Sequence, residues 1–188
     1  MPTSPPAAVL FDRDGTLVHD VPYNGEPALV EPVEGAAEVL AALRAEGVAL
    51  GVITNQSGIG RGLITRAQAD AVNARIEELL GPFDVWCVCP HAPEDGCGCR
   101  KPAPGMVLAA CEALGAAPEA TVMVGDIGAD MEAARRAGAR GILVPTPVTR
   151  REEVLAAPEQ ADDLAGALHL ILGRAQTPAG VTAAEAAQ

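Results

Sequence analysis

Asp12 and Asp14 are two carboxylates separated by one residue, an arrangement that could catalyse a reaction. They follow the apolar run at positions 7–11, so both carboxylates are expected where a buried strand ends. Two like charges this close repel each other and need a cation, usually a metal ion, to stay ionised together. One carboxylate could form an acyl phosphate and the other could transfer protons. An isolated Asp-x-Asp pair is more often a polar loop, so the rest of the chain must decide.

A second group of candidate ligands lies at residues 87–99, where four of the five cysteines occur. The pattern Cys89-x-His91, followed after five residues by Cys97-x-Cys99, offers three thiolates and one imidazole. This set suits tetrahedral Zn²⁺ and fills all four of its positions, which leaves none for a reactive water. The spacing therefore predicts a structural zinc site.

The other two cysteines have different interpretations. Cys87 could replace Cys89 as a ligand, although we interpret it as a strand residue. Cys111 falls in a predicted helix and is expected to be packed. Free cysteines on a loop are the alternative interpretation of the whole group.

The composition excludes several classes of protein. A length of 188 residues predicts one domain, and a net charge of −12 argues against nucleic-acid or anionic-membrane partners. No apolar run reaches the roughly 18 residues that span a bilayer. Residues 1–6 lack the features of a signal peptide, so we expect a cytoplasmic protein. Lys101 is the only lysine beside twelve arginines, which could mark a position that needs a compact ammonium.

Short apolar segments alternate with amphipathic ones. Strands are predicted at residues 7–12, 48–54, 83–88, 121–126 and 140–145. Helices are predicted at residues 34–46, 66–80, 105–115, 129–138 and 161–173, the second capped by Thr65. The alternation predicts an α/β fold, a doubly wound, Rossmann-like parallel sheet with helices on both faces. Residues 1–173 are expected to form this one domain and residues 174–188 a flexible tail.

Four predicted strands end in residues that could react or bind a ligand. In chain order these ends carry Asp12, Thr54-Asn55, Cys89 and Asp126. The carboxyl ends of parallel strands meet at one edge of a sheet, where ligands bind. We therefore expect these residues at a common rim, which weakens the loop interpretation of Asp12.

Four ordered segments resemble the motifs of the haloacid dehalogenase (HAD) superfamily. They are Asp12-Arg13-Asp14-Gly15-Thr16, Thr54-Asn55, Lys101 and Gly125-Asp126-Ile127-Gly128-Ala129-Asp130, and the match spans residues 7–145. Gln56-Ser57-Gly58 and Cys99-Arg100-Lys101-Pro102 further resemble subfamily IIIA. That branch holds the D-glycero-D-manno-heptose 1,7-bisphosphate phosphatases and the histidinol-phosphate phosphatases.

The resemblance implies roles for these motifs. Asp12 would attack phosphorus and form an aspartyl phosphate, while Asp14 would protonate the leaving group and then activate water. The Asp12 carboxylate, the Asp14 backbone carbonyl and Asp126 would hold Mg²⁺. Thr54 and Lys101 would bind the phosphoryl oxygens, whose negative charge must be neutralised.

Residues next to the motifs receive supporting roles by the same resemblance. Asn55 and Arg100 would bind phosphate or another part of the substrate. Asp130 is expected to support the site by orienting Lys101 or the metal. Arg61, in a glycine-rich loop, stays open between a phosphate contact and a surface ion pair.

The resemblance implies a cofactor pair of catalytic Mg²⁺ and structural Zn²⁺, and a monomer or weak homodimer. Many superfamily members carry a cap domain, but residues 17–33 and 58–98 leave no room for one, so we expect an open site. The favoured reaction is removal of the 7-phosphate from the heptose 1,7-bisphosphate, a small sugar bisphosphate.

Two alternatives to this reaction remain. Histidinol phosphate is the alternative substrate, because the zinc loop is short and Ile127 stands where a polar or basic residue is frequent. Its cationic groups would suit Glu94 and Asp95. The alternative outside the enzymes is an inactive, zinc-stabilised binding module, in which Asp14 would have no function.

Overall fold

The computed structural model describes residues 5–173; the segment predicted to be a flexible tail, 174–188, lies outside them. Five parallel strands form one sheet in the order β3-β2-β1-β4-β5. They are β1 Ala8–Phe11, β2 Ala49–Asn55, β3 Val85–Cys89, β4 Thr121–Gly125 and β5 Arg140–Leu143. Because the order reverses beside β1, the sheet is doubly wound, as predicted from the alternation of elements.

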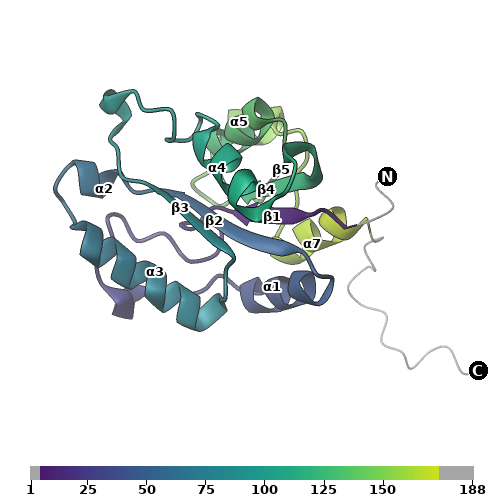
Figure 1. Ribbon diagram of the computed structural model, residues 1–188, viewed down its shortest axis with the longest axis horizontal. Helices are drawn as coiled ribbons and strands as arrows, with labels where there is room; N and C mark the ends of the chain where they lie inside the picture. The colour runs from purple at the N-terminus through teal and green to yellow at the C-terminus, as the bar shows by residue number, and fades with distance from the viewer. Residues whose placement is uncertain (1–4, 174–188) are drawn as a thin grey trace, which may run out of the picture.

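Helices lie on both faces of this sheet (Figure 1). The α-helices are α1 Ala36–Ala45, α2 Ser57–Gly60, α3 Arg66–Leu80, α4 Gly105–Leu114, α5 Gly128–Ala137, α6 Arg151–Ala156 and α7 Leu164–Leu172. Short 3₁₀ turns are η1 Pro27–Leu29, η2 Pro93–Asp95 and η3 Pro118–Ala120. α1, α3 and α7 cover one face, and α4 and α5 cover the other. No helix within residues 5–173 is long and apolar enough to cross a membrane.

Alternate residues of β1 belong to two different cores. Val9 and Phe11 join the cluster under α1, α3 and α7, whereas Leu10 joins the cluster under α4 and α5. This period of two follows from the pleat of a strand, and burial on both sides explains why β1 reads as a continuous apolar run. The strand thus carries Asp12 out of a dry core at its carboxyl end.

The observed elements differ from the predicted ones at their ends and in two short helices. α3 begins after Thr65 as predicted, with a capping box in which the Thr65 Oγ1 accepts from the Gln68 N–H at 3.1 Å. α7 begins at Leu164 rather than at 161, because the Asp163 carboxylate caps it by accepting from the Gly166 N–H at 2.7 Å. α2 and α6 were not predicted, since four and six residues are too few to show a helical period.

The core under α3 gives a direct test of the fold. Ile76 is fully buried on this helix, while Leu79, one turn along, is 37% exposed. Ile76→Ala should lower the free energy of unfolding by about 2–5 kcal/mol, because it removes buried methyl groups and leaves a cavity. Leu79→Ala should change it by no more than about 1 kcal/mol. Urea unfolding of the two variants measures both; equal losses would contradict this packing of α3.

Candidate active site

A cleft of about 380 Å³ opens at the carboxyl ends of β1, β2 and β4. Its lining includes seven of the residues predicted to act on substrate or metal, namely Asp12, Asp14, Thr54, Asn55, Arg100, Lys101 and Asp126. These residues come from four separate stretches of the chain. The rim expected from the strand ends is therefore present.

Lys101 is a buried cation shared by two carboxylates. Its Nζ lies 2.8 Å from Asp12 Oδ1 and 2.6 Å from Asp130 Oδ1, and it donates to the Ile53 carbonyl at 3.1 Å. Only 1% of the Lys101 side chain is exposed. A compact ammonium lies between two carboxylate oxygens here and donates to a carbonyl, which a planar guanidinium could not do in the same space. The only lysine of the chain thus occupies a position that requires one.

Burial and charge set the protonation of this group. Burial would lower the pKa of Lys101, but Asp12 and Asp130 raise it above its ordinary value, so the ammonium stays charged. Burial raises the pKa of Asp12 to about 8, against the attraction of Lys101 and with a contribution from Asp130. Burial and Asp130 likewise raise the pKa of Asp126 to about 7. Near neutral pH the burial of these two carboxyls therefore favours their protonated forms, and additional positive charge would favour the ionised forms.

The main chain at Lys101 is fixed by Asn55 at the end of β2. The Asn55 Nδ2 donates to the Lys101 carbonyl and its Oδ1 accepts from the Lys101 N–H, both at 3.1 Å. This reciprocal pair joins residues 46 positions apart. Asn55 was predicted to bind phosphate; in this structure its amide positions the lysine, while the residue also lines the cleft.

Asp14 has a separate set of partners from Asp12. The Arg13 Nε lies 3.1 Å from both Asp14 oxygens, and Arg13 Nη2 lies 3.0 Å from Oδ2. The Gln56 Nε2 donates to the same Oδ2 at 2.8 Å and to Thr54 Oγ1 at 2.9 Å. Because Thr54 Oγ1 accepts this bond, its own hydroxyl proton can be donated into the cleft.

Asp126 approaches β1 closely, and glycine makes this approach possible. Gly15 has a φ of +80°, and a Cβ there would collide with the Asp126 carboxylate. A Cβ at Gly125 would likewise collide with the Asp130 side chain. Thr149 holds the Asp126 backbone by donating its hydroxyl to the Asp126 carbonyl at 2.7 Å. Gly15 and Gly125 therefore let three aspartates converge.

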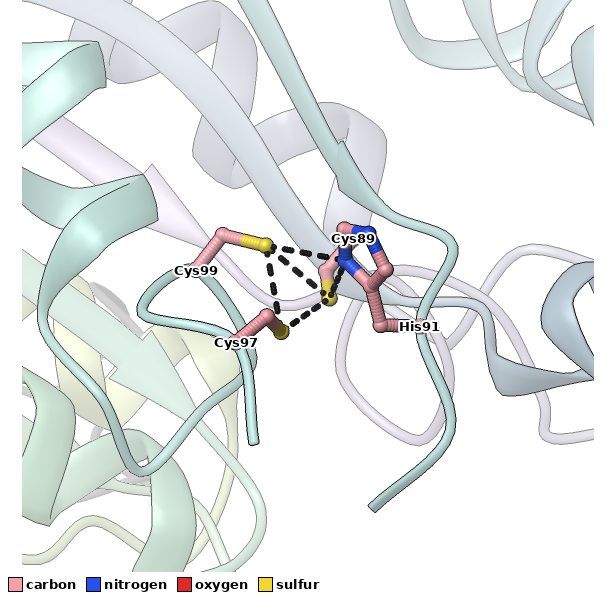
Figure 2. A group of neighbouring side chains, drawn as sticks. All are labelled: Cys89, His91, Cys97 and Cys99. Atoms are coloured by element: carbon pink, nitrogen blue, oxygen red, sulfur yellow. Dashed lines mark hydrogen bonds between the residues drawn. The ribbon is translucent and has the colours of Figure 1, made fainter. Parts of the chain in front are cut away.

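The predicted metal cluster assembles beside the cleft (Figure 2). Cys89, His91, Cys97 and Cys99 place their ligand atoms within 4.8 Å of one another, and Cys87 is not part of the group. The sulfur–sulfur distances are 3.3 to 3.7 Å, and His91 Nδ1 lies 3.3 Å from Cys99 and 3.5 Å from Cys89. A tetrahedral centre with bonds of about 2.3 Å to sulfur has sulfur–sulfur edges of about 3.8 Å, close to those observed.

The electrostatics of the cluster also suit a cation. Burial, with the neighbouring Cys99 and Cys97, raises the pKa of the Cys89 thiol to about 12. A metal must displace such a proton to bind, so its affinity rises with pH. A bound cation would therefore take the place of thiol protons, at a cluster whose geometry fits four such ligands. Cys111 lies apart from it, buried in α4 as predicted.

The two candidate arginines differ in position. Arg100 lines the cleft and donates from Nη1 to the His91 carbonyl at 3.3 Å, which ties it to the cysteine–histidine cluster. Arg61 does not line the cleft; its Nη1 donates to the Tyr23 hydroxyl at 3.1 Å. Neither arginine forms an ion pair with another residue of the range 5–173, and the contact observed for Arg61 is the one with Tyr23.

Comparison with known proteins identifies the family. A family model described as HAD-hydrolase-like matches residues 98–169. A D-glycero-β-D-manno-heptose-1,7-bisphosphate 7-phosphatase from Pseudomonas putida is 37% identical over 165 residues, which cover 84% of this chain and 94% of that protein. The chain belongs to the HAD phosphatases.

Further relatives agree with this placement. The enzyme of the same name from Escherichia coli K12 is 38% identical to this HAD phosphatase over 160 residues, covering 78% of this chain and 84% of the relative. The crystal structure of D,D-heptose 1,7-bisphosphate phosphatase from B. bronchiseptica, complexed with magnesium and phosphate, superposes with a TM-score of 0.78. It is 29% identical and covers 87% of this chain and 97% of its own.

Several residues that line the cleft of this HAD phosphatase were not selected from the sequence. They are Asp20, Tyr23, Gln56 and Val148, besides Arg13 between the two aspartates. Asp20 and Tyr23 lie in a loop without periodicity, and Val148 follows β5 on a loop with no charge. Gln56, two residues beyond Thr54, could have been found, because it immediately follows a motif at a strand end.

The shared lysine predicts a pH-dependent loss of stability. Lys101→Met keeps an unbranched side chain but leaves Asp12 and Asp130 buried without their cation. At pH 8 the free energy of unfolding should fall by about 3–5 kcal/mol. The loss should shrink toward pH 6, because Asp12, whose folded pKa of about 8 lies above its unfolded value, is protonated there and needs no cation; such a group destabilises the fold as pH rises. Urea unfolding at both pH values measures this.

A matched control for this variant is Arg75→Met, which removes an exposed arginine paired with Glu78 on α3. It should cost no more than about 1 kcal/mol at either pH. Equal losses for Lys101→Met at pH 6 and pH 8 would contradict the charge assignment.

Proposed function

We propose that this protein is a Mg²⁺-dependent phosphomonoesterase that removes the 7-phosphate of D-glycero-D-manno-heptose 1,7-bisphosphate through an aspartyl phosphate. The observation that carries the proposal is the separate anchoring of Asp12 and Asp14. One is bound to Lys101 at the cleft floor, and the other is bound to Arg13 and Gln56. Two carboxylates in different environments can take different roles. The names of the relatives support the substrate.

Asp12 is oriented as a nucleophile. Its Oδ1 accepts from the Arg13 N–H at 2.7 Å and from Lys101 Nζ at 2.8 Å. No hydrogen bond from residues 5–173 reaches Oδ2, so this oxygen is the one that attacks phosphorus. The Thr54 hydroxyl and the Lys101 ammonium then donate to the oxygens of the transferring phosphoryl group.

Asp14 transfers the protons. It gives its proton to the bridging oxygen as the phosphorus–oxygen bond breaks, and the resulting carboxylate then takes a proton from the water that attacks the aspartyl phosphate. Its side chain is 24% exposed, against 10% for Asp12, so it stands nearer to the leaving group and to water. Acid and base are therefore the same residue in successive steps.

The carboxylates of the cleft fit a magnesium ion. When ionised, Asp12, Asp126 and Asp130 carry three negative charges beside the single positive charge of Lys101. Oxygen ligands with a net charge of −2 suit a hard divalent cation. Asp12 and Asp126 would hold it with the Asp14 backbone carbonyl, since both Asp130 oxygens already bind Lys101 and the Ile127 N–H. Bound there, it would neutralise charge on the phosphoryl group.

The cleft favours a sugar bisphosphate over histidinol phosphate. Arg100 lines it and can meet a second anionic group. Glu94 and Asp95, the expected partners for the cationic groups of histidinol phosphate, do not line it. The Asp95 carboxylate instead accepts from the Ala92 N–H at 2.8 Å within the loop. Ile127 also lines the cleft and offers it an apolar contact. Asp20 lines it as well and could accept hydrogen bonds from hydroxyls or amines of a substrate.

The cysteine–histidine cluster completes the proposal as a structural Zn²⁺ site. Its four ligand positions are filled by protein, so it would not activate water. Cys99 stands two residues before Lys101, and Arg100 between them contacts His91. The metal would therefore fix the stretch that carries Arg100 and Lys101, two of the cations that line the cleft. Thiolate ligands require a reducing compartment, which supports a cytoplasmic location, and we propose a monomer or weak homodimer.

Phosphate release with Mg²⁺ tests the function. The wild-type protein should hydrolyse the heptose bisphosphate with a higher kcat/KM than histidinol phosphate. Asp12→Asn should abolish turnover, because an amide cannot form the acyl phosphate. Asp14→Asn should lower turnover by about 10²–10⁴-fold, the usual contribution of a positioned acid or base. A preference for histidinol phosphate would refute the substrate, and activity in Asp12→Asn would refute the nucleophile.

Metal analysis tests the cluster. Protein purified without chelators should contain about one zinc per chain. Cys97→Ser should lose it and become less stable, because binding energy of a structural metal is folding energy. Cys87→Ser is the matched control, since this cysteine lies on the adjacent strand but outside the cluster, and it should keep the metal. Zinc lost from Cys87→Ser and retained in Cys97→Ser would overturn the ligand set.

A further inference from the structure

Arg13 is a buried cation that the proposed reaction leaves without a task. It lies between the two aspartates, and only 1% of the residue is exposed. Its guanidinium engages Asp14 with Nε and Nη2, whereas its backbone N–H donates to Asp12. A fork of donors on one carboxylate fixes the orientation of that carboxylate as well as its charge.

The third donor of this fork reaches a helix sixty residues away. The Arg13 Nη1 donates to Asn73 Oδ1 on α3 at 2.8 Å. Asn73 is buried on the face of α3 that otherwise carries Ala69, Val72 and Ile76 into the core. A polar side chain on such a face is costly unless it is hydrogen-bonded. Its bond to Arg13 is what makes an asparagine suitable at this position.

The bonding leaves the two oxygens of Asp14 unequal. Among residues 5–173, Oδ2 is contacted by Arg13 Nε, Arg13 Nη2 and Gln56 Nε2, whereas Oδ1 is contacted by Arg13 Nε alone. Oδ1, the oxygen with fewer donors, is therefore the one better placed to carry a proton to a leaving group. The direction in which Oδ1 points depends on the fork, and the fork depends on Asn73.

We propose that Arg13 and Asn73 form a positioning pair that aims Asp14 Oδ1 for proton transfer to the leaving group. This inference rests on the proposed phosphatase function. In the first step Asp12 Oδ2 bonds to phosphorus, the bridging phosphorus–oxygen bond breaks, and the proton moves from Asp14 Oδ1 to the bridging oxygen. The alcohol leaves, and Arg13 faces the new Asp14 carboxylate. Without the Asn73 oxygen, the guanidinium can rotate and carry the carboxyl with it.

Leaving groups separate a proton-transfer role from a general structural one. A sugar alkoxide is a poor leaving group and needs the proton, whereas 4-nitrophenolate leaves well without it. kcat/KM reports the chemistry up to the first irreversible step, in which Asp14 acts as the acid. Asn73→Leu should therefore lower kcat/KM for the sugar phosphate about tenfold or more relative to 4-nitrophenyl phosphate.

The site tolerates these substitutions. Asn73 also borders a surface hollow of about 310 Å³ beside Trp86, which gives a leucine side chain room. Asn73→Ala removes the same oxygen without adding bulk, and it must change the ratio of the two substrates in the same direction. Asn73→Asp keeps an acceptor oxygen in place, so it should restore the ratio. Arg75→Leu, on the exposed face of the same helix, is the control and should leave the ratio unchanged.

A double-mutant cycle shows whether Asn73 acts through Arg13. Arg13→Met removes the fork and should lower the sugar-phosphate activity at least as much as Asn73→Leu. Adding Asn73→Leu to Arg13→Met should then have no further effect on the ratio. Additive effects, or a ratio unchanged in both Asn73→Leu and Asn73→Ala, would overturn the positioning pair while the phosphatase function stood. A wild-type protein that hydrolyses neither ester would overturn the function itself, and the inference with it.

Discussion

The buried contact of Lys101 with Asp12 and Asp130 is the interaction on which the rest of the site depends. An ammonium in a dry core is stable only beside carboxylates, and a reactive carboxylate in the same core stays charged only beside a cation. The ammonium and the carboxylates thus stabilise one another's charges in the buried site. The sheet supplies Asp12 from β1, the start of α5 supplies Asp130, and the loop before α4 supplies the lysine. Three elements are joined by one ammonium.

This dependence explains the elaborate support around one loop residue. Loops are the most mobile parts of most folds, yet here a loop must place an ammonium within hydrogen-bond distance of three acceptors. Asn55 binds its main chain from β2, and the cysteine–histidine cluster closes the loop just before it. The α2 turn adds the Gly60 N–H, which donates to the Pro90 carbonyl at 2.8 Å. The proposed metal site and the buried lysine therefore serve the same purpose, which is to position the Lys101 ammonium.

Much of this arrangement could be predicted from the sequence. The contacts that could not be predicted have one cause in common, which is that they join residues far apart in the chain. Apolar runs fixed the parallel sheet, and the polar residue after each run located the cleft, because both signals are local. The cysteine spacing also indicated the cluster before its geometry was known. The pairing of Arg13 with Asn73 was invisible, since it joins a motif to the buried face of a helix and neither residue stands out alone. Asn55 was located correctly, but its bonds to the Lys101 main chain depend on where the loop folds back.

Asp12 and Asp14 are only two positions apart, but they have different binding partners. The cationic partner of one is distant in the chain, and that of the other is adjacent, so their environments differ. Asp12 is bound by Lys101, which lies in the loop between β3 and α4. Asp14 is bound by the adjacent Arg13 and by Gln56. Burial and Asp130 raise the pKa of Asp12, yet its Oδ1 is held in place by two donors. Asp14 is more exposed than Asp12, which suits the proton transfers proposed for it. The two aspartates can therefore differ in role because each is bound to a different cation. Arg13, within the Asp-Arg-Asp motif, binds Asp14, and Lys101 binds Asp12.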